Sequence, residues 1–269
     1  MTVAEALSGS GIDLFEARLL LGSASGLSRA AMAAHPNAQL SQAVAENFRA
    51  TVTRRRCGEP IAYLLGAREF YGLSLAVTPD VLIPRPETEL LVEFALEHLP
   101  SSGSLLDLGT GSGAIALAVK QQRPDVRVTA VEQSPAAFVI ARENAARHGL
   151  EIEVLQGNWF DPLPDRRFDM VVSNPPYVAA GDRHLEQGDL RFEPPAALVG
   201  GADGLDAIRE IALLAPGHFL AGGWLAIEHG LGQDGAVRNL LTEIGLESVS
   251  SRPDLAGIAR ITVGKYNPD

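Results

Sequence analysis

Short apolar runs alternate with helical patterns through most of the chain, and this alternation limits the possible fold more than any other feature. The apolar runs occupy 104–109, 126–132, 152–158, 168–174 and 222–230, and helical patterns occupy 114 onward, 134–149 and 232–245. Parallel strands need a crossover connection, usually a helix, and such crossovers are almost always right-handed. The pattern therefore predicts an α/β domain with a mostly parallel sheet.

The N-terminal residues follow a different pattern. Segments 12–26 and 40–59 read as helices, and the second has Ser41 as a candidate N-cap and ends in cationic residues, as the helix dipole favours. Residues 68–80 alternate around Gly72, as expected for a hairpin. We therefore predict three parts, which are a helical bundle at 1–66, a hairpin linker at 67–84 and the α/β domain at 85–269.

Charge and composition limit the partners and the compartment. The net charge is −11, and residues 1–78 are nearly neutral with seven arginines and six acidic residues, so the rest carries about −12. A protein that binds duplex nucleic acid needs a cationic surface, and the run Arg54-Arg55-Arg56 is expected to be a solvated helix end. We predict no signal peptide, no membrane span and a cytoplasmic location, with which the single cysteine, Cys57, is consistent.

A glycine-rich loop joins the first predicted strand to its helix. Gly109, Gly111 and Gly113 allow tight turns and let a ligand approach the backbone. Ligands of open α/β sheets bind at the carboxyl ends of strands. Dinucleotide enzymes use G-x-G-x-x-G, whereas the spacing here is G-x-G-x-G after Asp107, which resembles S-adenosylmethionine-dependent methyltransferases. A glycine turn without a ligand is the alternative.

Two further strand ends predict contacts with such a cofactor. Glu132 ends the second strand, where a carboxylate can accept hydrogen bonds from both ribose hydroxyls. It could instead be an acidic residue at a helix N-terminus. After the third strand, Asn158 could bind an adenine edge while Trp159 or Phe160 covers the face of the ring; the alternative for the aromatic residues is core packing.

The fourth strand ends in Asn174-Pro175-Pro176-Tyr177, a sequence suited to chemistry on an NH2 group. The nitrogen of an amide or nucleobase is a poor nucleophile, so methylation requires acceptors that orient it. The Asn174 side-chain oxygen and the Pro175 carbonyl are two such acceptors, and the two prolines stiffen the turn. We expect Tyr177 to lie against the planar group and to stabilise positive charge on nitrogen. An ordinary turn is the alternative.

Several longer segments resemble the bacterial peptide chain release factor glutamine methyltransferases (the HemK type). They are 58–93, which contains "LIPRPETE", 190–211, which contains "RFEPPAAL", and 222–241, together with the glycine loop and N-P-P-Y. The resemblance covers nearly the whole chain and includes "SRPDLAGIARI", which matches the closing strands of the family. It implies a Rossmann-like class I methyltransferase with a seven-stranded sheet, preceded by a helical recognition domain and a hairpin.

The resemblance also implies the reaction and the site. The family transfers a methyl group from S-adenosylmethionine to the side-chain nitrogen (N5) of the glutamine in the Gly-Gly-Gln motif of class 1 release factors, leaving S-adenosylhomocysteine. The cofactor residues would be Gly109, Thr110, Gly111, Ser112, Gly113, Glu132, Asn158, Trp159 and Asn174. The substrate residues would be Asn174, Pro175, Pro176 and Tyr177, with Asn174, Pro175 and Tyr177 catalytic. Family members often carry Asp at the positions of Glu132 and Asn158.

Other interpretations stay open at this point. A DNA or RNA amino-group methyltransferase could use the same N-P-P-Y chemistry, although the acidic catalytic part and the lack of a basic recognition domain disfavour it. A cofactor-binding protein without catalysis is a third possibility, and a dehydrogenase is disfavoured by the glycine spacing. We expect a monomer that binds no metal and no nucleic acid directly. Glu87 and Glu89 could be first-turn acids or could line the cofactor site, and the long loop 178–203 is expected to be functional.

Overall fold

The computed structural model describes residues 1–268, which divide into two compact units. The first comprises residues 1–67 together with 186–192, and the second comprises residues 68–185 and those from 193 onward. The segment 186–192 therefore departs from the predicted boundaries, which had placed it in the α/β domain. No helix within residues 1–268 is long and apolar enough to cross a bilayer.

The first unit is a bundle of short helices. They are α1 Val3–Ser8, α2 Leu14–Ser25, α3 Arg29–Ala34, α4 Gln42–Arg56 and α5 Ile61–Leu65. The Asp13 side chain accepts hydrogen bonds from two backbone N–H groups at the start of α2, and Gly26 ends that helix at φ 73°. Ser41 caps α4 as predicted, and α4 ends at Arg56 in the predicted run of cationic residues. Buried side chains such as Leu20, Leu21 and Phe48 form the core of this unit.

The arginines 54–56 form the end of α4 as predicted, and Arg54 and Arg56 are exposed, but Arg55 is only partly exposed. Arg55 forms an ion pair with Glu16 at 2.7 Å and a longer one with Asp189 at 3.4 Å. Arg54 pairs with Glu59, and Arg56 donates hydrogen bonds to backbone carbonyls. The pairing with Asp189 helps explain why 186–192 belongs to the first unit.

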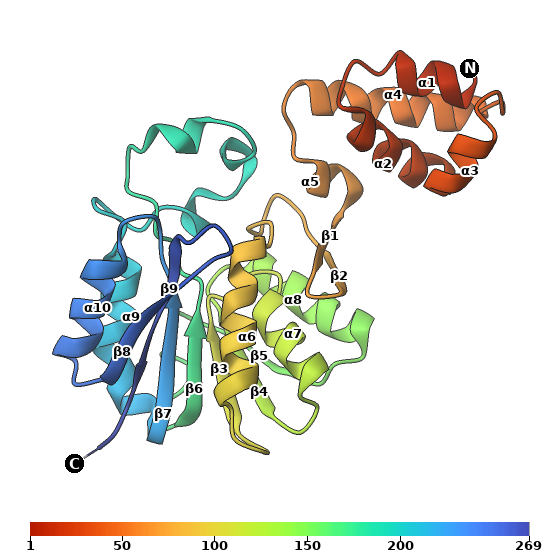
Figure 1. The fold of residues 1–269 in the computed structure, drawn as a ribbon. Coiled ribbons are helices and arrows are strands. Elements are labelled where there is room, and N and C mark those ends of the chain that lie inside the picture. Colours follow the sequence, from red (N-terminus) through yellow and green to blue (C-terminus); the bar gives the residue numbers. More distant parts are fainter. Residues whose placement is uncertain (269) are drawn as a thin grey trace. The chain divides into compact units, whose positions relative to one another are not determined.

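The second unit contains the predicted α/β sheet (Figure 1). Its strands are β3 Ser104–Leu108, β4 Arg127–Glu132, β5 Glu153–Gln156, β6 Phe168–Ser173, β7 Phe219–Glu228, β8 Glu247–Pro253 and β9 Ala259–Lys265. The order is β5-β4-β3-β6-β7-β9-β8, and β9 pairs in an antiparallel manner with both β7 and β8, whereas all the other pairs are parallel. The prediction of a mostly parallel seven-stranded sheet is confirmed.

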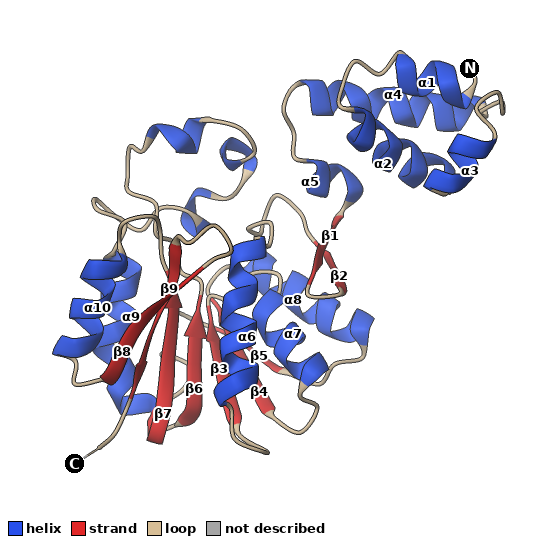
Figure 2. Cartoon of the chain, in the orientation of Figure 1, coloured by secondary structure: helices blue, strands red, loops and turns tan. Residues whose placement is uncertain are grey.

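Helices cover both faces of this sheet (Figure 2). They are α6 Glu89–His98, α7 Ala114–Gln122, α8 Pro135–His148, α9 Asp206–Leu214 and α10 Asp234–Glu243. One buried cluster joins the sheet to α6, α7 and α8, and a second joins it to α9 and α10. Because both faces are covered, the central strands are buried along most of their length, which is why they read as largely apolar runs.

The predicted hairpin is confirmed by β1 Ala67–Phe70 and β2 Leu73–Ala76. Tyr71 and Gly72 form its turn at φ 49° and 80°, as a two-residue type I′ turn requires. The fully buried side chain of Asn144 in α8 exchanges hydrogen bonds of 2.7 and 3.1 Å with the backbone of Ala76, and it also donates to the Ser112 carbonyl at 2.8 Å. One side chain thus holds the hairpin and the glycine loop together.

The parallel strands β3 to β7 end at one edge of the sheet, and irregular segments gather there. The 3-10 helices η1 Pro86–Thr88 and η4 Pro195–Ala197 belong to these segments, whereas η5 Ala215–His218 directly precedes β7 and lies at the other edge. The two remaining 3-10 helices of the chain are η2 Arg183–Glu186 and η3 Leu190–Phe192. The loop after β6 returns to its own start, because Val178 and Val199 form a β-bridge. This edge is where an open parallel sheet binds its ligands.

Candidate active site

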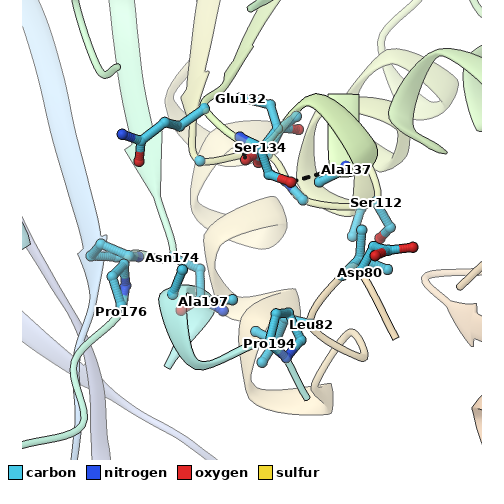
Figure 3. A pocket seen from close by; sticks show the side chains of 18 of the residues that line it. Asp80, Leu82, Ser112, Glu132, Ser134, Ala137, Asn174, Pro176, Pro194 and Ala197 are labelled. Carbon is cyan, nitrogen blue, oxygen red and sulfur yellow. Dashed lines mark hydrogen bonds between the residues drawn. The ribbon is translucent and has the colours of Figure 1, made fainter. Parts of the chain in front are cut away.

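A cavity of about 350 Å³ lies at the carboxyl edge of the sheet. It is lined by Asp80, Val81, Leu82, Pro84, Thr88, Gly109, Thr110, Gly111, Ser112, Ala114, Ile115, Glu132, Gln133, Ser134, Ala137, Gly157, Asn158, Trp159, Asn174, Pro175, Pro176, Pro194, Ala196 and Ala197. In the view of Figure 3, Asn174 and Pro176 lie across the cavity from Ser112 and Asp80. The structure therefore brings the glycine loop, Glu132, the Asn158-Trp159 pair and the start of N-P-P-Y to one cavity.

The glycine loop adopts backbone angles that favour glycine. Gly109, Gly111 and Gly113 have φ of 70°, 58° and 86°. A Cβ on Gly111 would meet no atom within 4 Å, so this glycine leaves open space on the cavity side. Gly113 does not line the cavity; a Cβ there would lie 3.0 Å from Leu117, so this glycine permits close packing at the start of α7.

Two buried carboxyl groups hold the loop. Asp107 accepts hydrogen bonds from the Thr110 hydroxyl at 2.6 Å and the Ala116 amide at 3.2 Å, and burial raises its pKa to about 7. The two oxygens of Glu132 accept from the amides of Gly111 and Ser134, each at 2.8 Å. Burial raises the pKa of Glu132 as well, against these hydrogen bonds. A carboxylate offers about four acceptor positions, so Glu132 still has acceptor capacity for two hydroxyl groups of a ligand.

The predicted adenine contacts lie at the end of β5. Asn158 and Trp159 both line the cavity, and their side-chain N–H groups donate to Glu210 of α9 at 3.1 and 2.9 Å. This pairing fixes the indole beside the loop, where a Cβ on Gly109 would be 3.3 Å from the ring. Phe160 is instead buried in the core and stacks on His218, so of the two aromatic residues only Trp159 lines the cavity.

Asn174 presents the oxygen of its side chain without a partner. Its Nδ2 atom donates to the Thr88 hydroxyl at 3.0 Å, whereas its buried Oδ1 atom has no hydrogen-bond partner among residues 1–268. A buried polar atom without a partner is costly and rare in native proteins. A donor group entering the cavity would relieve that cost, and Pro175 and Pro176 line the cavity beside it.

Tyr177 points away from the cavity in this structure. It does not line the cavity, and its hydroxyl donates to Oε1 of Glu228, at the end of β7, at 3.2 Å. Burial raises the pKa of Glu228 to about 7, and hydrogen bonds from Thr88 and Tyr177 act in the opposite direction. Tyr177 therefore contacts the same network as Thr88, and its predicted stacking on the substrate stays a prediction.

One wall of the cavity comes from two family-specific segments, of which "LIPRPETE" had been considered as a possible lining of the cofactor site. Glu193, whose side chain is fully buried, pairs with Arg85 and accepts a hydrogen bond from the Ile83 amide at 3.1 Å. The neighbouring residues 81–84 and 194–197 contribute lining side chains. The ion pair thus joins "LIPRPETE" to "RFEPPAAL", which explains why both segments accompany this site.

Two glycines pack against the backbone of the N-P-P-Y turn. A Cβ on Gly200 would overlap the Pro176 carbonyl oxygen, and one on Gly204 would overlap the Tyr177 carbonyl oxygen. The Gln233 side chain also donates to the Tyr177 carbonyl at 3.0 Å. The end of the long loop therefore packs against the N-P-P-Y turn and restricts its movement.

Several other polar and aromatic residues of the second unit have structural rather than site surroundings. Neither Glu87 nor Glu89 lines the cavity, and Glu89 accepts a hydrogen bond from the Tyr71 amide at 3.2 Å. Phe70 is buried in the core of the second unit. His229 is buried and bonded to Thr262 at 2.9 Å, and burial lowers its pKa, so its environment favours the neutral form.

Comparisons with known proteins agree with this geometry. Models of the methyltransferase small domain and of the PrmC N-terminal domain match residues 86–189 and 2–66. A release factor glutamine methyltransferase of Neisseria gonorrhoeae is 47% identical over 99% of this chain and 98% of its own length. One from Burkholderia pseudomallei is 50% identical over 98% of this chain and 96% of its own. The chain belongs to the release factor glutamine methyltransferase family.

The fold of this chain also resembles solved structures of other methyltransferases. A Pyrococcus furiosus methyltransferase has a TM-score of 0.58 at 18% identity, covering 83% of this chain and all of that one. The catalytic domain of human Mettl16 in complex with an RNA hairpin has a TM-score of 0.59 at 17% identity, and the match covers 82% of each chain. At these identities the likeness concerns the fold alone.

Proposed function

We propose that this protein transfers a methyl group from S-adenosylmethionine to the side-chain nitrogen (N5) of the glutamine in the Gly-Gly-Gln motif of class 1 release factors. The observation that carries the proposal is the buried Oδ1 of Asn174, which lines the cavity and lacks a hydrogen-bond partner among residues 1–268. A carboxamide NH2 group is a donor of the right kind for this acceptor. The names of the relatives point to the same substrate.

The cavity suits the cofactor on three grounds. Its volume of about 350 Å³ lies in the range of small-ligand sites. Glu132 has acceptor capacity for the ribose hydroxyls, and Trp159 offers an aromatic surface for the adenine. Gly109, Thr110, Gly111 and Ser112 would hold the amino-acid end, and Gly113 would support their turn. When bound, S-adenosylmethionine supplies a methyl group on a cationic sulfur and leaves as S-adenosylhomocysteine.

The residues at the end of β6 would prepare the glutamine nitrogen for reaction. Asn174 Oδ1 and the Pro175 carbonyl oxygen would accept hydrogen bonds from the two N–H groups of the glutamine amide. This would turn the nitrogen lone pair toward the methyl carbon. These acceptors would hold the nitrogen while the bound cofactor supplied its methyl group, and the methylated nitrogen would lose one proton to water. Both acceptors are rigid before binding, so their orientation costs little during the reaction. Tyr177 and Pro176 support the turn.

The substrate is a protein, and the helical unit provides surface for its recognition. We propose that residues 1–66 recognise the release factor, that 67–84 link the two parts, and that the enzyme acts as a monomer in the cytoplasm. The net charge of −11 disfavours nucleic acid as the substrate. Amino-group methylation of DNA or RNA is the alternative outcome of the test below.

The test compares two asparagine variants with labelled cofactor. Asn174→Ala should lower kcat by roughly 10²–10³, as for loss of one preplaced hydrogen-bonding group, while calorimetry shows cofactor affinity within a few fold of the wild type. Asn239→Ala, on the exposed surface of α10, is the matched control. Tritiated cofactor is offered with release factor, with a Gly-Gly-Glu variant of it, and with DNA or RNA. Label in nucleic acid but not in release factor would refute the proposed substrate.

A further inference from the structure

The two ends of the Asn174 carboxamide are nearly equal in size, but only one of them suits the reaction. The oxygen end accepts a hydrogen bond from the NH2 group of the substrate, whereas the nitrogen end would place donor against donor. A rotation of about 180° around the terminal bond would exchange them, and such terminal torsions are broad and roughly two-fold. Some other group must therefore hold the amide in the productive orientation.

Thr88 is the group that contacts the nitrogen end. Thr88 is the last residue of η1 and is only 3% exposed. Its Oγ1 atom lies 3.0 Å from Asn174 Nδ2. A hydroxyl can accept and donate at once. The Thr88 oxygen can accept a hydrogen bond from Nδ2 only when its own proton points in another direction.

The carboxyl group of Glu228 is the acceptor that we consider for that proton. The residue is 1% exposed, its Oε1 accepts from Tyr177 at 3.2 Å, and its Oε2 has no close hydrogen-bond partner among the described residues. Hydrogen bonding from Thr88 lowers the pKa of this carboxyl group, against burial, which raises it. An ionised carboxyl only accepts, and a neutral one retains an accepting oxygen. A Thr88 proton turned toward this carboxyl group would leave the lone pairs of the hydroxyl for Asn174.

We propose that Thr88 is a positioning residue, which holds Nδ2 of Asn174 so that Oδ1 faces the NH2 group of the substrate. This inference rests on the proposed function. It also gives the family-specific segment "LIPRPETE" a second task besides forming a wall of the cavity.

The kinetic test uses a substitution of equal shape. Thr88→Val removes the hydroxyl and should lower kcat by about 10- to 100-fold, the range typical of groups that orient a reacting ligand from behind. Cofactor affinity and the unfolding midpoint should change little. Thr88→Ser should recover most of the rate because it restores the hydroxyl. Thr242→Val on the exposed face of α10 removes a similar hydroxyl and should act as the wild type.

A double variant separates positioning from general damage. If Thr88 acts through Asn174, then adding Thr88→Val to Asn174→Ala should cause no further loss of kcat. Independent, multiplying losses would overturn the inference, and so would a Thr88→Val enzyme within about twofold of the wild type. A Thr88→Ser enzyme as slow as Thr88→Val would also overturn it.

A readout without turnover keeps this inference distinct from the proposed substrate. In ¹⁵N spectra, the Asn174 side-chain NH2 signal is identified by its absence in Asn174→Ala. Its hydrogen exchange should be slow in the wild type and in Thr88→Ser, and faster in Thr88→Val. Equal exchange in all three would overturn the positioning role. If exchange behaves as expected but the wild type transfers no methyl group to release factor, then only the proposed substrate is wrong.

Discussion

Replacing Gly200 by alanine should disable the enzyme although Gly200 does not line the cavity. A Cβ there would lie 2.7 Å from the Gly204 carbonyl oxygen and closer still to that of Pro176. Both distances are well inside the optimal separation of about 3.5–4.0 Å. The contacts are with backbone atoms, so one of the two chain segments must move by about 1 Å, and a displacement of that size near the reacting groups can cost about 10² in rate.

The matched control is Gly217→Ala, because a Cβ at Gly217 would meet no atom within 4 Å and neither glycine has a positive φ. Overpacking at Gly200 should also lower the free energy of unfolding by about 1–3 kcal/mol. The assay is single-turnover methyl transfer to release factor, with cofactor affinity and urea unfolding measured in parallel. A Gly200→Ala enzyme with the rate of Gly217→Ala would show that the turn tolerates displacement, and it would refute the reasoning.

Two further predictions concern buried charges. Glu193→Ala removes one partner of a buried ion pair and should lower the free energy of unfolding by about 3 kcal/mol, with weaker cofactor binding because residues 194–197 lose their anchor; unchanged urea midpoints would contradict this. Asp107 has its pKa raised to about 7 by burial, so the folded state binds the proton more tightly than the unfolded state. Its contribution to stability is therefore greatest below its ordinary pKa near 4 and is lost as pH rises to about 7. Asp107→Asn should lack this loss, so its stability relative to the wild type should rise by about 1–3 kcal/mol between pH 5 and 8; a difference that stays constant with pH would contradict this.

Much of the fold could be predicted from local patterns because the relevant forces are local or depend on periodicity. The strands β3, β4, β6 and β7 are buried on both faces, so their apolar runs were visible in the sequence. The caps of α2 and α4 are short-range side-chain contacts. The placement of 186–192 was not predicted, because it depends on long-range contacts such as that of Asp189 with Arg55.

Some residues of the site could likewise be predicted from local patterns, whereas the roles of others depend on the folded chain. Residues at strand ends, such as Glu132 and Asn174, could be found because the carboxyl ends of parallel strands meet at one edge. The direction in which Tyr177 points was not predictable, since it depends on Glu228, 51 positions away in sequence. The roles of Arg85 and Glu193 also required the folded chain, because they are separated by 108 positions.

The sequence by itself determined the class of fold, the edge of the sheet that carries the site and the chemical groups available there. Only the tertiary structure decided which of those groups face the cavity and which end of an amide is free. The physical reason is that periodicity and caps act over a few residues, whereas the orientation of a buried polar side chain depends on partners brought from distant parts of the chain.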